Sequence, residues 1–260
     1  MKALAASRRS RYAPALLVLL ALLLIGGLYA ALAPKPATAA TTGNAQDTQQ
    51  GKELFQANCS TCHGLDAQGT DIAPSLIGVG AASVDFQVST GRMPMANNSP
   101  QAEEKPAQFN TEEITQMAAY VASLGPGPAI PTAEQVDPAG GDPARGMELF
   151  RTNCAMCHNA VGAGGALSEG KYAPSLDDST PTEIYEAMLT GPQSMPVFNE
   201  ANIDPQGKQD IIAFLYEQRE TSPGGLKLGA LGPVAEFVWA FVIGIGGLIG
   251  FAVWIGAKSS

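Results

Sequence analysis

Two long apolar runs stand near the two ends of the chain, and a mainly polar region separates them. The first run covers residues 12–32 and carries no charged residue, and the second covers residues 234–256 and has Glu236 near its start. A helix of about 20 apolar residues can cross the hydrocarbon core of a bilayer. We therefore predict a membrane segment at each end of the chain, within residues 1–33 and residues 232–256.

Charges beside the two runs predict the orientation of the chain. Four basic residues precede the first run, and Lys258 follows the second. Because basic flanks stay on the cytoplasmic side, we expect both termini in the cytoplasm and the region between the runs on the extracytoplasmic side of the cell membrane. We favour a retained N-terminal anchor, although Ala37-Thr38-Ala39 fits a signal-peptidase site and leaves a cleaved signal segment as the alternative.

The region between the apolar runs contains an internal repeat. GKELFQANC at residues 51–59 recurs as GMELFRTNC at residues 146–154, 95 positions later. APSL, Thr-Gly and Met-Pro recur in the same order in both units. Apolar residues at helical spacing then predict an amphipathic helix at the end of each unit, over residues 111–124 and 206–220. We expect Thr111 to cap the first of these two helices.

The repeat predicts two similar helical domains, because two copies of one pattern fold in the same way. We place the domains at residues 48–125 and 143–222. Residues 34–47 are small and polar, and residues 126–142 are rich in Pro and Gly. Both of these segments are predicted to be linkers.

Each unit contains one Cys-x-x-Cys-His motif, and the two motifs hold every cysteine and histidine of the chain. Two thiols on one helical turn can form thioethers to the vinyl groups of one haem, and the adjacent His can ligate the iron. We therefore predict two covalently bound haem c groups. The predicted attachment residues are Cys59, Cys62, Cys154 and Cys157, and the predicted proximal iron ligands are His63 and His158.

Other uses of the cysteines fit the chain less well. A single zinc site from both Cys pairs would leave about a hundred residues between its two halves, far more than zinc ribbons have. A thioredoxin-like redox pair needs no His after the second Cys. A disulfide within the motif would be strained.

The region between the two membrane segments is acidic. Residues 34–233 hold 10 of the 15 basic residues and 23 of the 24 acidic ones, which gives a net charge of −13. This charge argues against a nucleic-acid partner. It suits a cationic or dipolar protein partner, or it serves only to keep exported domains soluble.

The order of features in each unit resembles the class I cytochrome c fold, over roughly residues 48–125 and 143–220. The resemblance implies a mainly α protein with two tandem cytochrome c domains, in which the first helix of each domain crosses the last through a Gly and an aromatic residue. It also implies that the carbonyl of Pro74 or Pro174 orients the proximal His. The crossing residues that it implies are Gly51, Phe55 and Tyr120 in the first unit and Gly146, Phe150 and Phe214 in the second.

A methionine is the predicted distal ligand of each iron. The chain has no third His, so bis-His ligation is excluded. A Met opposite His fills the iron site and raises the haem potential, which favours electron transfer over substrate binding. We predict Met93 and Met195, each followed by Pro, and Met95 stays open as the alternative in the first unit. Three other methionines are expected on helices, the first two in the core: Met117, Met147 and Met188.

The whole arrangement resembles the dihaem cytochrome c subunits of actinobacterial cytochrome bc complexes, which are menaquinol–cytochrome c reductases. The resemblance rests on the repeat order, on Thr-Gly-x-Met-Pro at residues 90–94 and on Glu-Phe-x-Trp at residues 236–239. It implies a membrane subunit beside cytochrome b and a Rieske iron–sulfur protein. Electrons would pass from menaquinol through the iron–sulfur protein to the first haem, the second haem and a terminal cytochrome c oxidase. The quinol site would lie in cytochrome b, so no catalytic residue is expected in this chain.

Three other functions stay open at this point. The chain could be the dihaem electron-transfer subunit of a periplasmic dehydrogenase. It could be a dihaem peroxidase, although a peroxidase needs an open iron site and two Met-Pro pairs argue against one. It could also be an assembly subunit with structural haems. Gly246 and Gly250 in the second apolar run suit close packing of another membrane helix, which argues against a free carrier.

Overall fold

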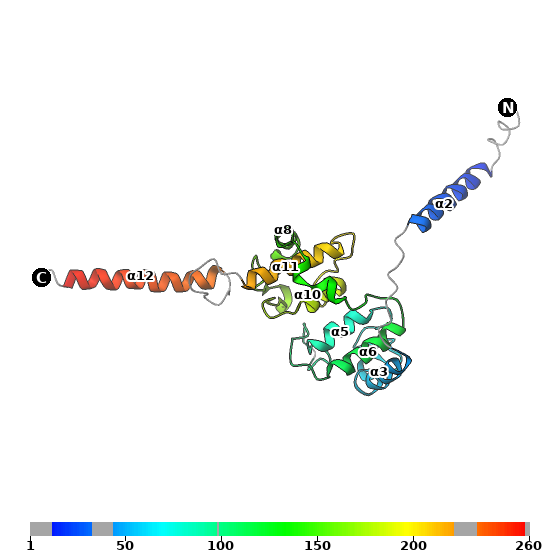
Figure 1. The fold of residues 1–260 in the computed structure, drawn as a ribbon, viewed down its shortest axis with the longest axis horizontal. Coiled ribbons are helices and arrows are strands. Elements are labelled where there is room, and N and C mark those ends of the chain that lie inside the picture. The colour runs from blue at the N-terminus through cyan, green and yellow to red at the C-terminus, as the bar shows by residue number, and fades with distance from the viewer. Residues whose placement is uncertain (1–11, 33–43, 98, 221–232, 258–260) are drawn as a thin grey trace, which may run out of the picture. The chain divides into compact units, whose positions relative to one another are not determined.

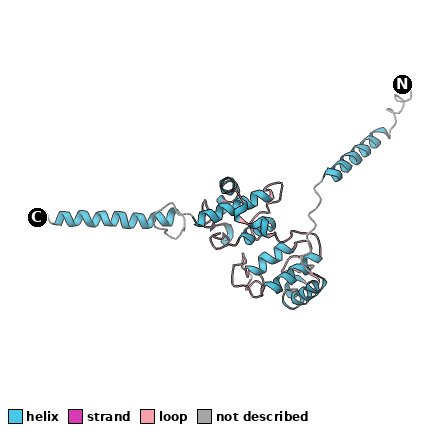
Figure 2. Cartoon of the chain, in the orientation of Figure 1, coloured by secondary structure: helices cyan, strands magenta, loops and turns pink. Residues whose placement is uncertain are grey.

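The computed structural model describes residues 12–32, 44–97, 99–220 and 233–257, and their regular structure is mainly helical (Figures 1 and 2). The chain divides into two units, residues 1–38 and residues 39–260. The first unit contains helix α2 (Ala13–Leu32). The second unit contains both sequence repeats and helix α12 (Pro233–Ala257).

The first repeat is built around three helices, α3 (Ala45–Asn58), α5 (Ala81–Ser89) and α6 (Thr111–Ser123) (Figure 1). The single turn α4 (Ser60–His63) follows α3 directly. Apolar residues that recur at helical spacing face inward and form one core cluster, because burial of this stripe is what stabilises an amphipathic helix. Its fully or nearly fully buried members include Phe55, Ile114, Met117, Tyr120 and Val121.

The residue that caps helix α6 is Asn110, one residue before the predicted cap. The side-chain oxygen of Asn110 accepts a hydrogen bond from the backbone N–H of Glu113 at 3.0 Å, and the Glu113 carboxylate accepts one from the Asn110 N–H at 2.9 Å. The expectation that Thr111 caps the helix is therefore wrong. Asn offers the same capping oxygen, and the reciprocal bond from Glu113 decides which of the two neighbouring residues is the cap.

The second repeat has the same plan. Its helices are α8 (Pro143–Asn153), the turn α9 (Ala155–His158), α10 (Pro181–Thr190) and α11 (Pro205–Glu220). The last of these agrees with the predicted helix at residues 206–220. Two short antiparallel strands, β1 (Gly165–Ala166) and β2 (Tyr172–Ala173), pair with Gly165 opposite Ala173, and the 3-10 turn η2 (Ser168–Gly170) joins them.

The predicted crossing of the first and last helices is confirmed in both repeats. A methyl group at Gly51 would overlap the backbone carbonyl of Gln116, and one at Gly146 would overlap that of Asp210. The aromatic pairs lie beside these contacts, with ring centroids 5.3 Å apart for Phe55 and Tyr120. The corresponding distance is 5.5 Å for the second pair, Phe150 and Phe214.

The segment predicted as the second linker, residues 126–142, contains short helical turns. These are α7 (Ala133–Val136) and η1 (Pro138–Gly140). The side-chain amide of Gln209 on α11 donates to the carbonyls of Glu134 at 2.7 Å and Asp137 at 2.9 Å. These bonds hold the segment against the second repeat.

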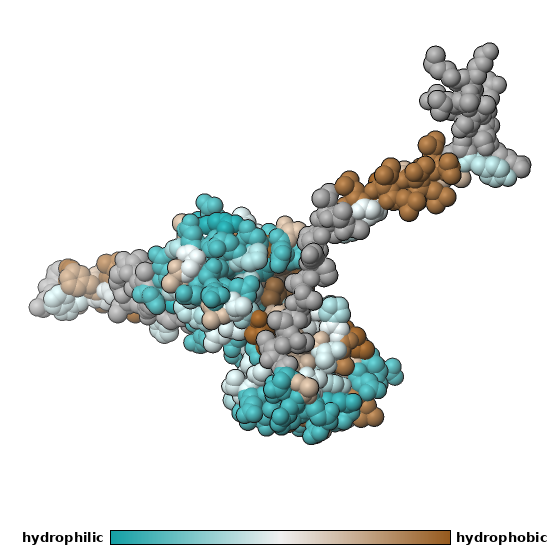
Figure 3. Space-filling view, turned by 45° about the vertical axis from the view of Figure 1, so that its right-hand side comes forward, coloured by the Kyte–Doolittle hydropathy of each residue, from teal (hydrophilic) through white to brown (hydrophobic). Residues whose placement is uncertain are grey.

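The two terminal helices expose apolar side chains. Among the described residues, one stretch, Phe237–Ala257 in α12, is long and apolar enough to cross a membrane. The apolar stretch of α2, Pro14–Tyr29, is shorter, and Figure 3 shows a nearly continuous hydrophobic surface along that helix. The basic flank before residue 12, the possible cleavage site at residues 37–39, Lys258 and the predicted domain end at residue 222 lie outside the described residues.

Candidate haem sites

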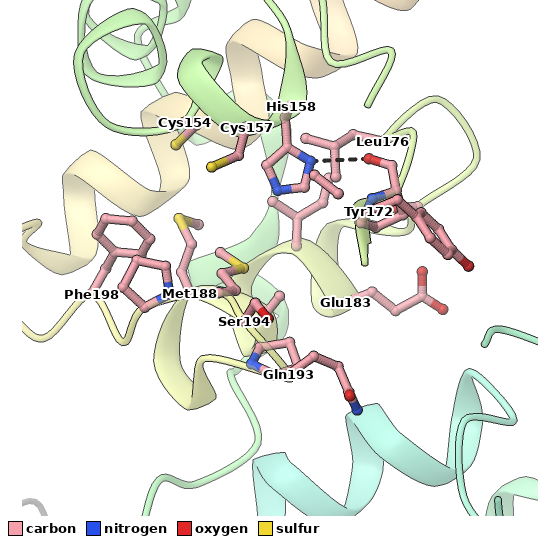
Figure 4. A pocket seen from close by; sticks show the side chains of 18 of the residues that line it. Cys154, Cys157, His158, Tyr172, Leu176, Glu183, Met188, Gln193, Ser194 and Phe198 are labelled. Atoms are coloured by element: carbon pink, nitrogen blue, oxygen red, sulfur yellow. Dashed lines mark hydrogen bonds between the residues drawn. The ribbon is translucent and has the colours of Figure 1, made fainter. Parts of the chain in front are cut away.

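The second Cys-x-x-Cys-His motif lies where α8 passes into α9. Cys154 caps the C-terminus of α8, and its carbonyl accepts a hydrogen bond from the N–H of His158 at 2.9 Å. This turn places Cys154, Cys157 and His158 together on one wall of a pocket (Figure 4). Burial, together with the neighbouring thiol, raises the pKa of Cys154 to about 12. The thiols of dithiol redox centres have lowered pKa values instead.

The His158 ring is oriented by the predicted backbone contact. Its Nδ1 lies 3.0 Å from the carbonyl oxygen of Pro174 and donates to it, which leaves Nε2 for a metal (Figure 4). Burial lowers the pKa of His158, and the Pro174 carbonyl opposes this shift. A neutral imidazole held through Nδ1 is the form that ligates iron.

Two methionines also line the pocket. Met188 lies on helix α10, as expected, and its side chain is buried. Met195 is half-buried on the following loop. The rest of the lining is mostly apolar and comes from all the helices of the repeat, so it fits a flat apolar macrocycle with a His on one wall. The apolar lining includes Phe150, Ile184, Leu176, Phe198, Ile211 and Leu215.

The first motif has the same local geometry. Cys59 caps α3, and Cys62 and His63 lie on α4. The Nδ1 of His63 lies 2.8 Å from the carbonyl oxygen of Pro74, so the predicted contact is present here too. Burial, with a smaller contribution from Cys62, raises the pKa of Cys59 to about 11. These residues fit a second covalent haem held like the first.

The methionines of the first repeat differ in their surroundings. Met93 is half-buried and packs against the core cluster of that repeat, and its N–H donates to the Gln87 carbonyl at 2.8 Å. Met95 is 40% exposed. Met117 is buried in α6 as expected. The core expectation for Met147 is wrong, because Gly146 faces α11 and the next residue, which is 38% exposed, points away from that contact.

Residues of the first repeat also line the second pocket, which sequence reasoning missed. Gln101 pairs with the backbone of Tyr172: its side-chain amide donates to the carbonyl, and its side-chain oxygen accepts from the N–H, each at 2.9 Å. Gln193 extends from the pocket toward the first repeat (Figure 4), and its side-chain oxygen accepts from the N–H of Ala102 at 3.3 Å. The lining residues from the first repeat are Phe86, Thr90, Arg92, Gln101 and Glu104.

Comparisons with known proteins agree with this geometry. The family model "Cytochrome c" matches residues 48–125, and the model "Cytochrome C oxidase, cbb3-type, subunit III" matches residues 141–215. The chain is thus a c-type cytochrome with two covalently bound haem c groups. It is 45% identical over 259 residues to the cytochrome bc1 complex cytochrome c subunit of Mycobacterium tuberculosis, which covers 96% of this chain and 92% of the relative. The chain belongs to the family of cytochrome bc1 complex cytochrome c subunits.

The chain was also compared with a second relative and with a solved structure. The cytochrome bc1 complex cytochrome c subunit of Corynebacterium efficiens is 48% identical over 228 residues, which are 81% of this chain and 76% of the relative. A chain of the Kuenenia stuttgartiensis reducing HAO-like protein complex matches 65% of this chain and 96% of its own length, with 13% identity and a TM-score of 0.33. A TM-score of 0.33 does not establish a shared fold.

Proposed function

We propose that this chain is the membrane-bound dihaem subunit that carries electrons from a quinol-oxidising cytochrome bc complex to a terminal cytochrome c oxidase. The observation that supports it best is family membership over 96% of the chain, which includes both haem sites and the C-terminal helix. Haem iron supplies the one-electron chemistry. The chain on its own is an electron carrier, and the quinol–cytochrome c reductase activity belongs to the complex.

The residues of each site have separate tasks in this proposal. Cys59 and Cys62 hold the first haem through thioethers, and Cys154 and Cys157 hold the second. The proximal ligands His63 and His158 are kept in a fixed orientation by the Pro74 and Pro174 carbonyls. Met93 and Met195 serve as the distal ligands, which close the iron sites to small substrates and raise the potentials.

The terminal helices support a membrane location for both haem domains. We place both termini in the cytoplasm, with α2 retained as an anchor and the two repeats on the extracytoplasmic side. In α12, a methyl group at Gly246 or Gly250 would meet nothing within 4 Å. Such small residues allow a neighbouring membrane helix to approach closely. Cytochrome b, the membrane-embedded subunit of the complex, is the partner we propose for this face.

Purification of the tagged full chain in mild detergent tests the proposed partners. We expect cytochrome b, a Rieske iron–sulfur protein and oxidase subunits to co-purify, and the intact mass of the chain to include residues 1–33. Replacement Gly246→Leu should weaken recovery of cytochrome b, because a larger side chain keeps the partner helix away. The matched control Ile249→Leu should not. Recovery of the chain without these subunits would contradict the proposal.

A further inference from the structure

The loop that carries Met93 in the first repeat also forms part of the second haem pocket. Arg92 immediately precedes the proposed distal ligand of the first haem, and its side chain lines the pocket of the second. The two sites are therefore connected by one peptide bond between Arg92 and Met93.

The Arg92 side chain is buried and held in place. Its guanidinium carbon lies 4.9 Å from the centre of the Phe86 ring, and its Nη2 donates to a carboxylate oxygen of Glu104 at 3.1 Å. The Arg92 side chain is 10% exposed, whereas that of Glu104 is 60% exposed. Glu104 also lines the pocket, but water screens its carboxylate more strongly than the guanidinium, so the positive charge of Arg92 is the less screened of the two.

The backbone around Arg92 is also fixed. The N–H of Gly91 donates a hydrogen bond to the backbone carbonyl of Val88 at 3.1 Å. A methyl group at Gly91 would overlap the backbone carbonyl of Lys105. Farther along the same segment, the paired bonds between Gln101 and Tyr172 join it to the second repeat. The backbone is therefore fixed before Arg92 by contacts within the first repeat and after Arg92 by the bonds of Gln101 to the second repeat.

We propose that Arg92 is an electrostatic positioning residue shared by the two haem sites, and that its guanidinium raises the reduction potential of the second haem. This inference rests on the proposed electron-carrying function. In the transfer step, one electron leaves the ferrous iron of the first haem, which becomes ferric, and reduces the ferric iron of the second, with no bond made or broken. A nearby positive charge favours the reduced second haem, because reduction adds one negative charge there.

A spectroelectrochemical redox titration of the purified full chain tests this role. Replacement Met195→His identifies the second haem, because it moves the midpoint of that haem alone. We expect Arg92→Gln to lower the equilibrium constant for reduction of the second haem by about threefold to tenfold, which is roughly 30–60 mV for a one-electron couple. Arg92→Lys keeps the charge and should restore most of the potential. Glu104→Gln should shift the midpoint in the opposite direction.

The control is Arg151→Gln, which removes the same charge from an exposed position on α8 that does not line the pocket. The midpoint potential of the second haem in this control variant should equal that in the parent protein. The inference is overturned if Arg92→Gln and Arg151→Gln give the same midpoint, or if Glu104→Gln lowers it. Because Glu104 is exposed, its variant remains informative even if Arg92→Gln disturbs folding. Two reversible one-electron waves in every variant would leave the electron-carrying function standing in either case.

Discussion

The His of each haem motif is oriented by one backbone carbonyl, and the methionine proposed as the distal ligand of each iron lies on a loop. The His contacts are 2.8 Å for His63 and 3.0 Å for His158. A carbonyl that accepts a hydrogen bond from Nδ1 fixes both the orientation of the ring and its tautomer. Nε2 is then left unprotonated and able to bind iron. On the distal side, position in the repeat favours Met93, and the structure packs its side chain against the core cluster, whereas Met95 is 40% exposed.

The two candidates in the first repeat can be separated by paired substitutions. We expect Met93→Leu to lower the midpoint potential of the first haem and to let carbon monoxide bind the reduced iron, because the thioether ligand is lost. Met95→Leu should change neither property. Redox titration and carbon monoxide difference spectra measure both effects. Rapid carbon monoxide binding to the unmodified protein would instead favour a peroxidase-like open site.

At the scale of the helices, the crossing of the first and last helix holds each repeat together. In the second repeat the contact also contains a buried carboxylate. Asp210 accepts from an Arg145 guanidinium nitrogen at 2.8 Å and from the Asp142 N–H at 2.8 Å. The close approach at Gly146 is what allows these bonds between α8 and α11 to form.

Replacement Gly146→Ala should destabilise the second repeat by about 3 kcal/mol or more, because the new methyl group meets a backbone carbonyl that cannot rotate away. The gain of about 1 kcal/mol in helix propensity is smaller than this cost. Denaturant unfolding followed by haem absorbance measures the difference. The exposed control Glu148→Ala on the same helix should stay within about 0.5 kcal/mol of the parent. An equally small effect of Gly146→Ala would show that the helices can separate freely.

At the scale of the whole second unit, the two repeats contact each other through α5 and α10, and this contact contains a buried acid. Glu186 is 0% exposed, and its carboxyl group faces the Asp85 side chain of α5, with which it can share a proton. Burial, then the charge of Asp85 and a side-chain hydrogen bond with it, and last the charge of Glu183 on the same helix, raise the pKa of Glu186 to about 9. Burial also raises the pKa of Asp85. Glu186 is therefore protonated at neutral pH.

This raised pKa predicts a pH-dependent stability. The folded chain keeps the Glu186 proton up to about pH 9, whereas the unfolded chain releases it near the ordinary value of 4.5. The stability that the proton contributes is complete below about pH 4.5 and is lost as the pH rises through about 9. Replacement Glu186→Gln cannot ionise, so its unfolding free energy should improve relative to the parent between pH 5 and 9.

Unfolding midpoints at about pH 5, 7 and 9 measure this dependence. Glu148→Gln, which removes an exposed carboxylate, serves as the control and should run parallel to the parent. Parallel profiles for Glu186→Gln and the parent would show that Glu186 is ionised in the folded protein.

Much of this protein could be predicted from local patterns along the chain. The haem motifs and the repeat depend on residues close in sequence or at equivalent places in two copies. The resemblance of this pattern to the class I cytochrome c fold implied the contacts of Pro74, Pro174, Gly51 and Gly146, which the structure contains. Whether Met147 is buried or exposed depended on which face of α8 packs against α11, and the local pattern did not determine that face.

The contribution of the first repeat to the second haem pocket followed from folding alone. Gln101 and Tyr172 are 71 residues apart in the chain, and Asp85 and Glu186 are farther apart still. Such pairs meet because the two repeats pack against each other, and neither partner carries a local sequence signature of that packing. The two haem motifs could therefore be predicted from the sequence, whereas the contribution of Arg92 to the lining of the second pocket was decided by the packing of the two repeats against each other.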